Sequence, residues 1–230
     1  MNDHLRQFER TATFAIYVLF AFGGIWHVLG VFQHLMRFLA APLLISVSLL
    51  LFYTVYRSVD HSFRSRFSIW LLVILIVGWG IEYCGVETHF PFGSYWYGNA
   101  LQPQILNIPI AIGFAWFSIC LSSILMSHRM MRNLHLKPAH QTWLSPFLSA
   151  AFMLFFDFIM EQAAPKLDYW IWQNGAAPIK NYVSWFVLGY GFSFLFQKMR
   201  ISLMRYSIFG MHVYLSQLLY FLLVILKPEW

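Results

Sequence analysis

Two acidic residues lie one helical turn apart within an apolar stretch of this sequence. Asp157 and Glu161 fall in the segment MLFFDFIMEQ, which is otherwise rich in Phe, Met and Ile. Their i, i+4 spacing puts both carboxyl groups on one face of a helix. Desolvation and mutual repulsion disfavour two charges there, so we expect one carboxyl of the pair to stay protonated. A neutral carboxylic acid in apolar surroundings can donate a proton, so the pair of Asp157 and Glu161 is a candidate proton donor.

A third acid, Glu82, interrupts another apolar stretch, GWGIEYCG. An ionisable residue in a membrane span costs about 2.5–3.5 kcal/mol on insertion scales and usually has a function. A structural role stays open, because such a carboxyl can simply accept hydrogen bonds from Trp, Tyr or a neighbouring helix. We favour a functional site over a structural role, since the three acids fall on the same side of the predicted membrane.

The elements that would carry these acids are membrane-spanning helices. Of the 230 residues, 60% are apolar and only 10% are charged, whereas soluble domains carry about 25% charged residues. Long uninterrupted apolar runs also argue against an outer-membrane barrel. We predict one all-α integral membrane domain with seven spans, over residues 12–32, 38–56, 67–85, 108–127, 143–161, 182–196 and 207–226. The sixth is the weakest, because 15 residues reach only about 22 Å as a helix.

The distribution of Lys and Arg predicts the orientation of the bundle. Because positive charge resists translocation, the side richer in Lys and Arg faces the cytoplasm. With the N-terminus inside, the inner segments hold Arg6, Arg10, Arg57, Arg64, Arg66, Arg129, Arg132, Lys137, Lys198, Arg200 and Arg205, and the outer ones hold Arg37, Lys166, Lys180 and Lys227. We therefore predict an inside N-terminus in a multi-pass protein of a prokaryotic inner membrane, with no nucleic-acid partner. Glu9, in the N-terminal segment, is expected to be exposed.

Two long outer connections, residues 87–107 and 162–181, are rich in aromatic residues. Long loops in compact proteins are usually functional, and we expect both to fold back as a cap over the site. The aromatic side chains Tyr95, Trp96, Tyr97, Trp170 and Trp172 are candidates for binding the substrate. Matching intervals from acid to aromatic residue suggest a parallel internal repeat, over residues 67–127 and 143–198.

Other chemistries find little support in the sequence. The histidines form no cluster of the kind that membrane di-iron enzymes need, and the last predicted span has no Lys for a retinal Schiff base. Phosphate-binding and dinucleotide-binding fingerprints are missing. Cys84 and Cys120 fall in or beside spans, which argues against a disulfide framework. We expect no metal and no cofactor.

Two motifs resemble a known membrane family. The first, EYCGVETHFPFGSYWY, starts at Glu82 and is followed by NIP and Trp116. The second, FDFIME, contains Asp157 and Glu161 and is followed by DYWIW, APIKN and Trp185. Together they resemble the signature of a carotenoid-biosynthesis family that contains the carotenoid 1',2'-hydratases, which act on bisanhydrobacterioruberin, lycopene or γ-carotene.

The resemblance covers about residues 75–190, and the chain departs from the family pattern at His89, where Gly is common, and at Gln162, where Pro is common. It implies an enzyme that adds water to the terminal isopropylidene double bond of an acyclic carotenoid. For that reaction a neutral Asp157 would donate the proton, and Glu161 or Glu82 would orient the water and accept its proton. The resemblance also implies that Asn181 and Trp185 belong to the substrate site. The partners would be the carotenoid, the membrane and other enzymes of the pathway.

Two other functions stay open at this point. A transporter or lipid-binding bundle would use Asp157 and Glu161 as a proton relay or cation site. An O₂-dependent hydroxylase would need a metal site that the sequence does not reveal.

Overall fold

Each predicted apolar run forms a helix in the computed structural model, which describes residues 3–133, 138–203 and 207–227. The α-helices within these residues are α1 (Asp3–Leu29), α2 (Gln33–Tyr56), α3 (Arg64–Thr88), α4 (Ala111–Asn133), α5 (Pro138–Ala163), α6 (Ile179–Lys198) and α7 (Phe209–Ile225). Two short 3₁₀ turns, η1 (His61–Phe63) and η2 (Pro165–Leu167), lie in the connections. The prediction of an all-α membrane bundle is confirmed.

Five helical segments are long and apolar enough to cross a membrane, judged by length and composition: Arg6–Leu29, Gln33–Tyr56, His61–Thr88, Ala111–Asn133 and Thr142–Ala163. Helix α7 is apolar but shorter, with 17 residues. Helix α6 has 20 residues and extends beyond the predicted span at both ends. It begins directly after Pro178, whose extended backbone ends the preceding loop, and at about 1.5 Å per residue it reaches about 30 Å.

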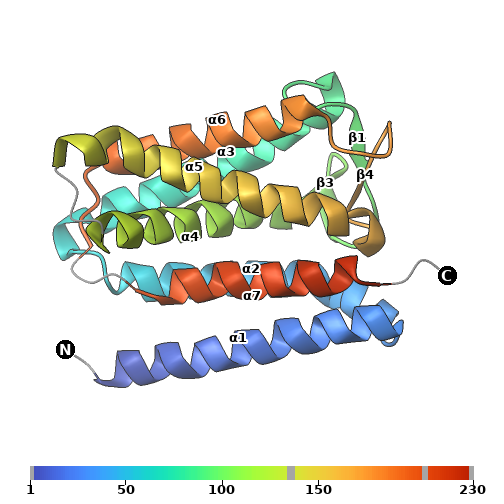
Figure 1. Ribbon diagram of the computed structural model, residues 1–230, viewed down its shortest axis with the longest axis horizontal. Helices are drawn as coiled ribbons and strands as arrows, with labels where there is room; N and C mark the ends of the chain where they lie inside the picture. The colour runs from blue at the N-terminus through green and yellow to red at the C-terminus, as the bar shows by residue number, and fades with distance from the viewer. Residues whose placement is uncertain (1–2, 134–137, 204–206, 228–230) are drawn as a thin grey trace.

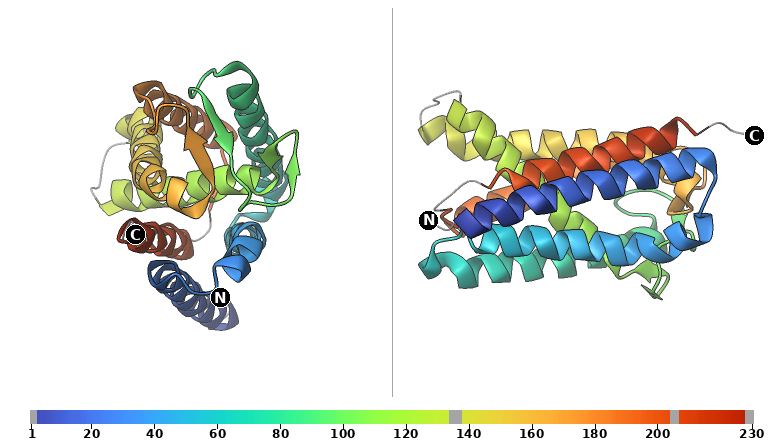
Figure 2. Two further views of the ribbon diagram at one scale, coloured as in Figure 1. Left: turned by 90° about the vertical axis from the view of Figure 1, so that its right-hand side faces the viewer. Right: turned by 90° about the horizontal axis from the view of Figure 1, so that it is seen from below.

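Helix α4 forms the centre of the bundle and contacts α2, α3, α5, α6 and α7. Its sequence contains the buried small residues Ser118, Ser122 and Ser123, which allow neighbouring helices to approach closely. Helix α1 lies outermost and packs mainly along α7, as the two views of Figure 2 show. Helix α1 therefore packs at the edge of the bundle, mainly against α7.

The two long connections meet at one end of the bundle, opposite the N-terminus (Figure 1). Strand β1 (Tyr95–Tyr97) pairs antiparallel with β4 (Trp170–Trp172), so that Tyr95 lies opposite Trp172 and Tyr97 opposite Trp170. A small hairpin, β2 (Gln104–Ile105) with β3 (Ile108–Pro109), completes the first connection. We call residues 89–110 and 164–178 the cap. The expected cap of two aromatic connections is confirmed.

One expectation about the N-terminal segment is wrong. Glu9 is buried, and one of its carboxylate oxygens accepts a hydrogen bond from the Ser207 hydroxyl at 3.0 Å. The physical reason is that α1 begins at Asp3, so Glu9 lies inside a packed helix rather than in an exposed leader. Glu9 is therefore unsuitable as a silent control for mutagenesis.

Two further expectations stay predictions. Lys137 and Arg205, which contributed to the charge asymmetry, lie outside the described residues, and the structure does not assign either end of the bundle to the cytoplasm. The internal repeat over residues 67–127 and 143–198 also stays a prediction.

Candidate active site

Helix α3 brings Glu82 against two aromatic side chains because glycines flank it on the same face. A Cβ atom at Gly78 would lie 2.8 Å from Cβ of Trp116, and one at Gly85 would lie 2.8 Å from the Tyr95 hydroxyl. The spacing of four and three residues puts Gly78, Glu82 and Gly85 on one helix face. The missing side chains leave room for Trp116 and Tyr95 to reach the carboxyl group.

The Glu82 carboxyl group accepts three hydrogen bonds. The Trp116 indole N–H donates to Oε1 at 2.9 Å, the Tyr97 hydroxyl donates to Oε2 at 2.9 Å, and the Tyr95 hydroxyl also donates to Oε2. Burial, and then the neighbouring Glu82, raise the pKa of Tyr95 and Tyr97 well above the ordinary value. Both phenols therefore keep their protons and act as donors to the Glu82 carboxyl group.

Glu161, on α5, has a matching set of donors from the second half of the chain. The Trp172 and Trp170 indole N–H groups donate to Oε2 at 2.6 and 3.1 Å, and the Asn181 side-chain amide donates to Oε1 at 3.3 Å. The paired strands β1 and β4 hold the tyrosines and the tryptophans side by side, with the Tyr95 and Trp172 rings 5.0 Å apart. The cap therefore donates hydrogen bonds to both carboxyl groups.

Asp157 lies one turn before Glu161 and is fully buried, with 0% of its surface exposed. The Asn181 amide donates to its Oδ2 at 3.0 Å, so a single amide bridges the two carboxyl groups. Its Oδ1 has no hydrogen-bond partner among the described residues. An ionised carboxylate would leave that oxygen uncompensated, which favours the neutral form of Asp157.

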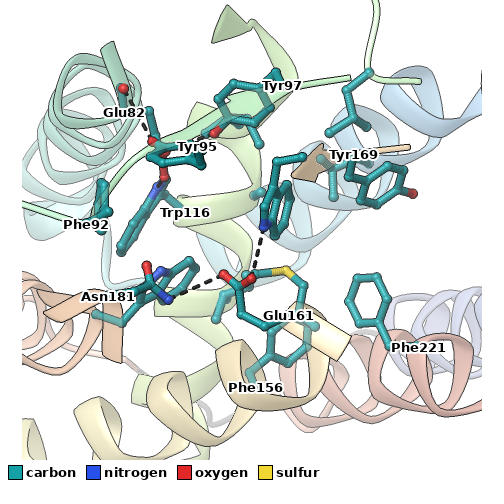
Figure 3. A pocket seen from close by; sticks show the side chains of 18 of the residues that line it. Glu82, Phe92, Tyr95, Tyr97, Trp116, Phe156, Glu161, Tyr169, Asn181 and Phe221 are labelled. Carbon is teal, nitrogen blue, oxygen red and sulfur yellow. Dashed lines mark hydrogen bonds between the residues drawn. The ribbon is translucent and has the colours of Figure 1, made fainter. Parts of the chain in front are cut away.

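Glu82 and Glu161 line one small cavity of about 60 Å³ beneath the cap. Figure 3 shows them on different walls, Glu82 beside Tyr95, Tyr97 and Trp116, and Glu161 beside Asn181. Of the residues expected from the sequence, the structure brings these into the lining: Glu82, Glu161, Tyr95, Tyr97, Trp170, Trp172, Asn181 and Trp185. A reacting group in this cavity would have a carboxyl group on either side.

Two expected site residues do not line the cavity. Asp157 lies behind Glu161 and reaches the cavity only through it. Trp96 is 50% exposed, because successive residues of β1 point to opposite faces and its neighbours Tyr95 and Tyr97 face inward. In a strand of three residues this alternation could not be placed from the sequence.

Other lining residues escaped the sequence reasoning. Trp116 stacks on Trp185 with ring centroids 4.0 Å apart, so these two tryptophans form one wall. Each of the two sequence motifs is followed by one of these tryptophans. This parallel could have identified Trp116 as a lining residue. Tyr169 and Gln217 also line the cavity, and neither showed a distinguishing pattern.

The fold and site together define a multi-helix membrane protein with buried carboxyl groups in an aromatic cavity. Within the described residues, no three His, Cys, Asp or Glu side chains are arranged to hold a metal ion. The sequence profile of the carotenoid biosynthesis protein family matches residues 38–227. The chain belongs to this family, and its function lies in carotenoid biosynthesis.

A curated relative is the bisanhydrobacterioruberin hydratase of Haloarcula japonica, which is 26% identical over 123 residues. That match covers 52% of this chain and 41% of the relative, so the chain aligns with less than half of the relative's length. No solved structure matches the chain.

Proposed function

We propose that this protein is a hydratase that adds water to the terminal isopropylidene double bond of an acyclic carotenoid end, as found in lycopene, γ-carotene or a bacterioruberin precursor. The observation that carries the proposal is the placing of Glu82 and Glu161 on different walls of one aromatic cavity. The family and the hydratase relative support the same reaction class.

The first step is proton transfer to the alkene. We assign the acid role to Glu161, because it lines the cavity, and the role of proton reserve to Asp157, which shares Asn181 with it. Glu161 gives its proton to the CH carbon of the double bond, and a C–H bond forms as the π bond breaks. The product is a tertiary carbocation, and Asp157 resupplies the proton to Glu161.

The second step is capture of the carbocation by water. The rings of Trp116, Trp185 and Trp172 line the cavity, and their electron-rich faces stabilise a cation. An ionised Glu82 adds the attraction of a negative charge, orients the water and accepts its proton as the C–O bond forms. The site is restored when that proton returns to the pair formed by Asp157 and Glu161.

This reaction needs only water as a co-reactant, which gives a direct test. A host that makes an acyclic carotenoid should, on expression of this protein, accumulate a more polar pigment heavier by the mass of one water. Growth in oxygen-labelled water should place the label in the new hydroxyl group. Glu161→Gln, produced at the same membrane level, serves as the control that lacks the acid.

Two outcomes would contradict the proposal. Unchanged pigments in hosts that make lycopene, γ-carotene and bisanhydrobacterioruberin would favour a transporter or lipid-binding bundle. Incorporation of label from O₂ instead of water would favour an oxygen-dependent hydroxylase. A hydratase would also work in sequence with other membrane enzymes that supply and consume the same pigment.

The close packing of Trp116 against Gly78, one helical turn from Glu82, can be tested by mutation. Gly78→Leu should displace Trp116, remove its hydrogen bond to Glu82 and lower the hydration rate by at least about tenfold, the cost of one lost charge-assisted hydrogen bond. Gly80→Leu is the matched control, because a Cβ atom at Gly80 would meet no atom within 4 Å beyond the adjoining backbone of its own helix and its chain neighbours. Pigment conversion at equal protein level measures the effect, and equal rates for the two variants would show that the Trp116 position does not matter.

A further inference from the structure

The cavity that holds the carboxyl groups is far too small for a whole carotenoid. Pockets for drug-sized ligands occupy about 300–1,000 Å³, whereas this cavity measures about 60 Å³. It has room for a chain end and a water molecule. The rest of a long polyene must therefore lie outside the cavity, along a surface that begins at its wall.

A second, larger hollow lies between α1, α2 and α7 and measures about 690 Å³. Apart from Tyr169, Gln217 and Tyr220, its lining consists of aliphatic and aromatic side chains and Gly23. Its α1 wall includes Val18, Leu19 and Phe22, which are partly exposed on a helix long and apolar enough to span the membrane. We call this hollow the groove.

The groove and the cavity share part of their lining. Leu44, Tyr169, Gln217 and Phe221 line both of them. In Figure 3, Tyr169 and Phe221 lie on the side of the cavity away from Phe92 and Asn181. We call these four residues, at which the two spaces adjoin, the neck.

The neck is more polar than the groove. Gln217 is buried and its side-chain amide donates to the Val213 carbonyl of its own helix at 3.3 Å. Tyr169 is hydrogen-bonded to Tyr220, and burial raises the pKa of Tyr169 to about 12, so its hydroxyl stays protonated. The change from an apolar groove to a polar neck and an acidic cavity matches a molecule that is hydrocarbon along its length and reacts at its end.

We infer that the groove holds the polyene chain of the carotenoid substrate, whose end passes Tyr169, Gln217 and Phe221 to reach Glu161. The inference rests on the proposed function. The groove adjoins the site at four shared lining residues, and two of its walls, α1 and α2, are long and apolar enough to span a membrane. The polyene chain would therefore enter sideways from the bilayer. Occupation by phospholipid acyl chains alone is the alternative outcome of the test.

A matched pair of leucines on α2 tests the inference. Leu39 lines the groove, whereas Leu49 is exposed on the same helix and lies outside the groove. Leu39→Trp should raise KM for the full-length carotenoid by roughly tenfold and leave kcat nearly unchanged, because overfilling the groove weakens binding without touching the acids. Leu49→Trp should behave as the wild type. A ten-carbon alkene with the same isopropylidene end should be converted equally by all three proteins.

A second measurement does not depend on catalysis. A photo-crosslinking amino acid at position 39, in membrane vesicles that contain the carotenoid, should capture pigment, and the same group at position 49 should not. Capture of phospholipid without pigment at position 39, or equal KM values for both tryptophan variants, would overturn the inference. Capture of pigment by the crosslinker at position 39, together with a wild-type protein that never hydrates the pigment, would refute the proposed function and leave the groove assignment intact.

Discussion

Glu161→Gln is expected to lower the hydration rate by about 10²- to 10⁴-fold, the usual loss when a general acid or base is removed. Glutamine can still accept from the Trp170 and Trp172 indoles, which hold the carboxyl group in place. The variant loses the transferable proton and, at the other oxygen position, the acceptor of the Asn181 amide. Conversion of an acyclic carotenoid in membrane vesicles, at equal amounts of folded protein, measures the effect.

The control for this variant is Glu87→Gln, because Glu87 is exposed near the end of α3 and on the same side of the bundle as the cap. It should convert the pigment at the wild-type rate. A Glu161→Gln protein as active as this control would remove Glu161 from the mechanism and leave Glu82 as the acid that contacts the substrate.

Asp157→Asn is expected to lower kcat by at least about 10²-fold while KM changes by less than about twofold. Asparagine can still accept from the Asn181 amide at the same oxygen position, so the packing of α5 against α6 is preserved. KM should hold because Asp157 does not line the cavity and does not touch the substrate. Membrane insertion should be undisturbed, since an ionisable group leaves the span.

A purely structural Asp157 would behave differently. In the proposed mechanism Asp157 acts through Glu161, so its loss should also change the shape of the pH profile of kcat, which reports the groups that titrate in the enzyme–substrate complex. Rates and a pH profile equal to those of the wild type would show that Asp157 only accepts a hydrogen bond from Asn181. The proton reserve would then have to be another group.

The positions of the helices could be predicted from the sequence because their signal is strong and local. Runs of about 20 apolar residues have one stable arrangement in a membrane, so each predicted span coincides with a helix. The ends of the helices were harder to predict than their positions, as α6 shows. Its first residues, Ile179 to Asn181, belong to the helix only because Pro178 ends the loop, and they are not apolar throughout.

The site was predicted less completely, because its geometry depends on contacts between distant residues. Buried acids stand out in any apolar stretch, and Asp157, Glu161 and Glu82 were recognisable for that reason. The pairing of β1 with β4 is not encoded in either strand alone, so the outward position of Trp96 could not be foreseen. The burial of Glu9 depends in the same way on Ser207, almost two hundred residues later in the chain.

The origin of the hydrogen bonds to each carboxyl group has a consequence for how the protein is made. The donors described for Glu82 (Tyr95, Tyr97 and Trp116) come from the hairpin of α3 and α4, and those for Glu161 from the hairpin of α5 and α6. Each hairpin can therefore enter the bilayer during synthesis with its own acid already shielded, which reduces the cost of inserting a polar group. Docking of the two hairpins through the cap would then form the cavity, so the proposed catalytic centre would assemble only after both acids have been inserted into the membrane.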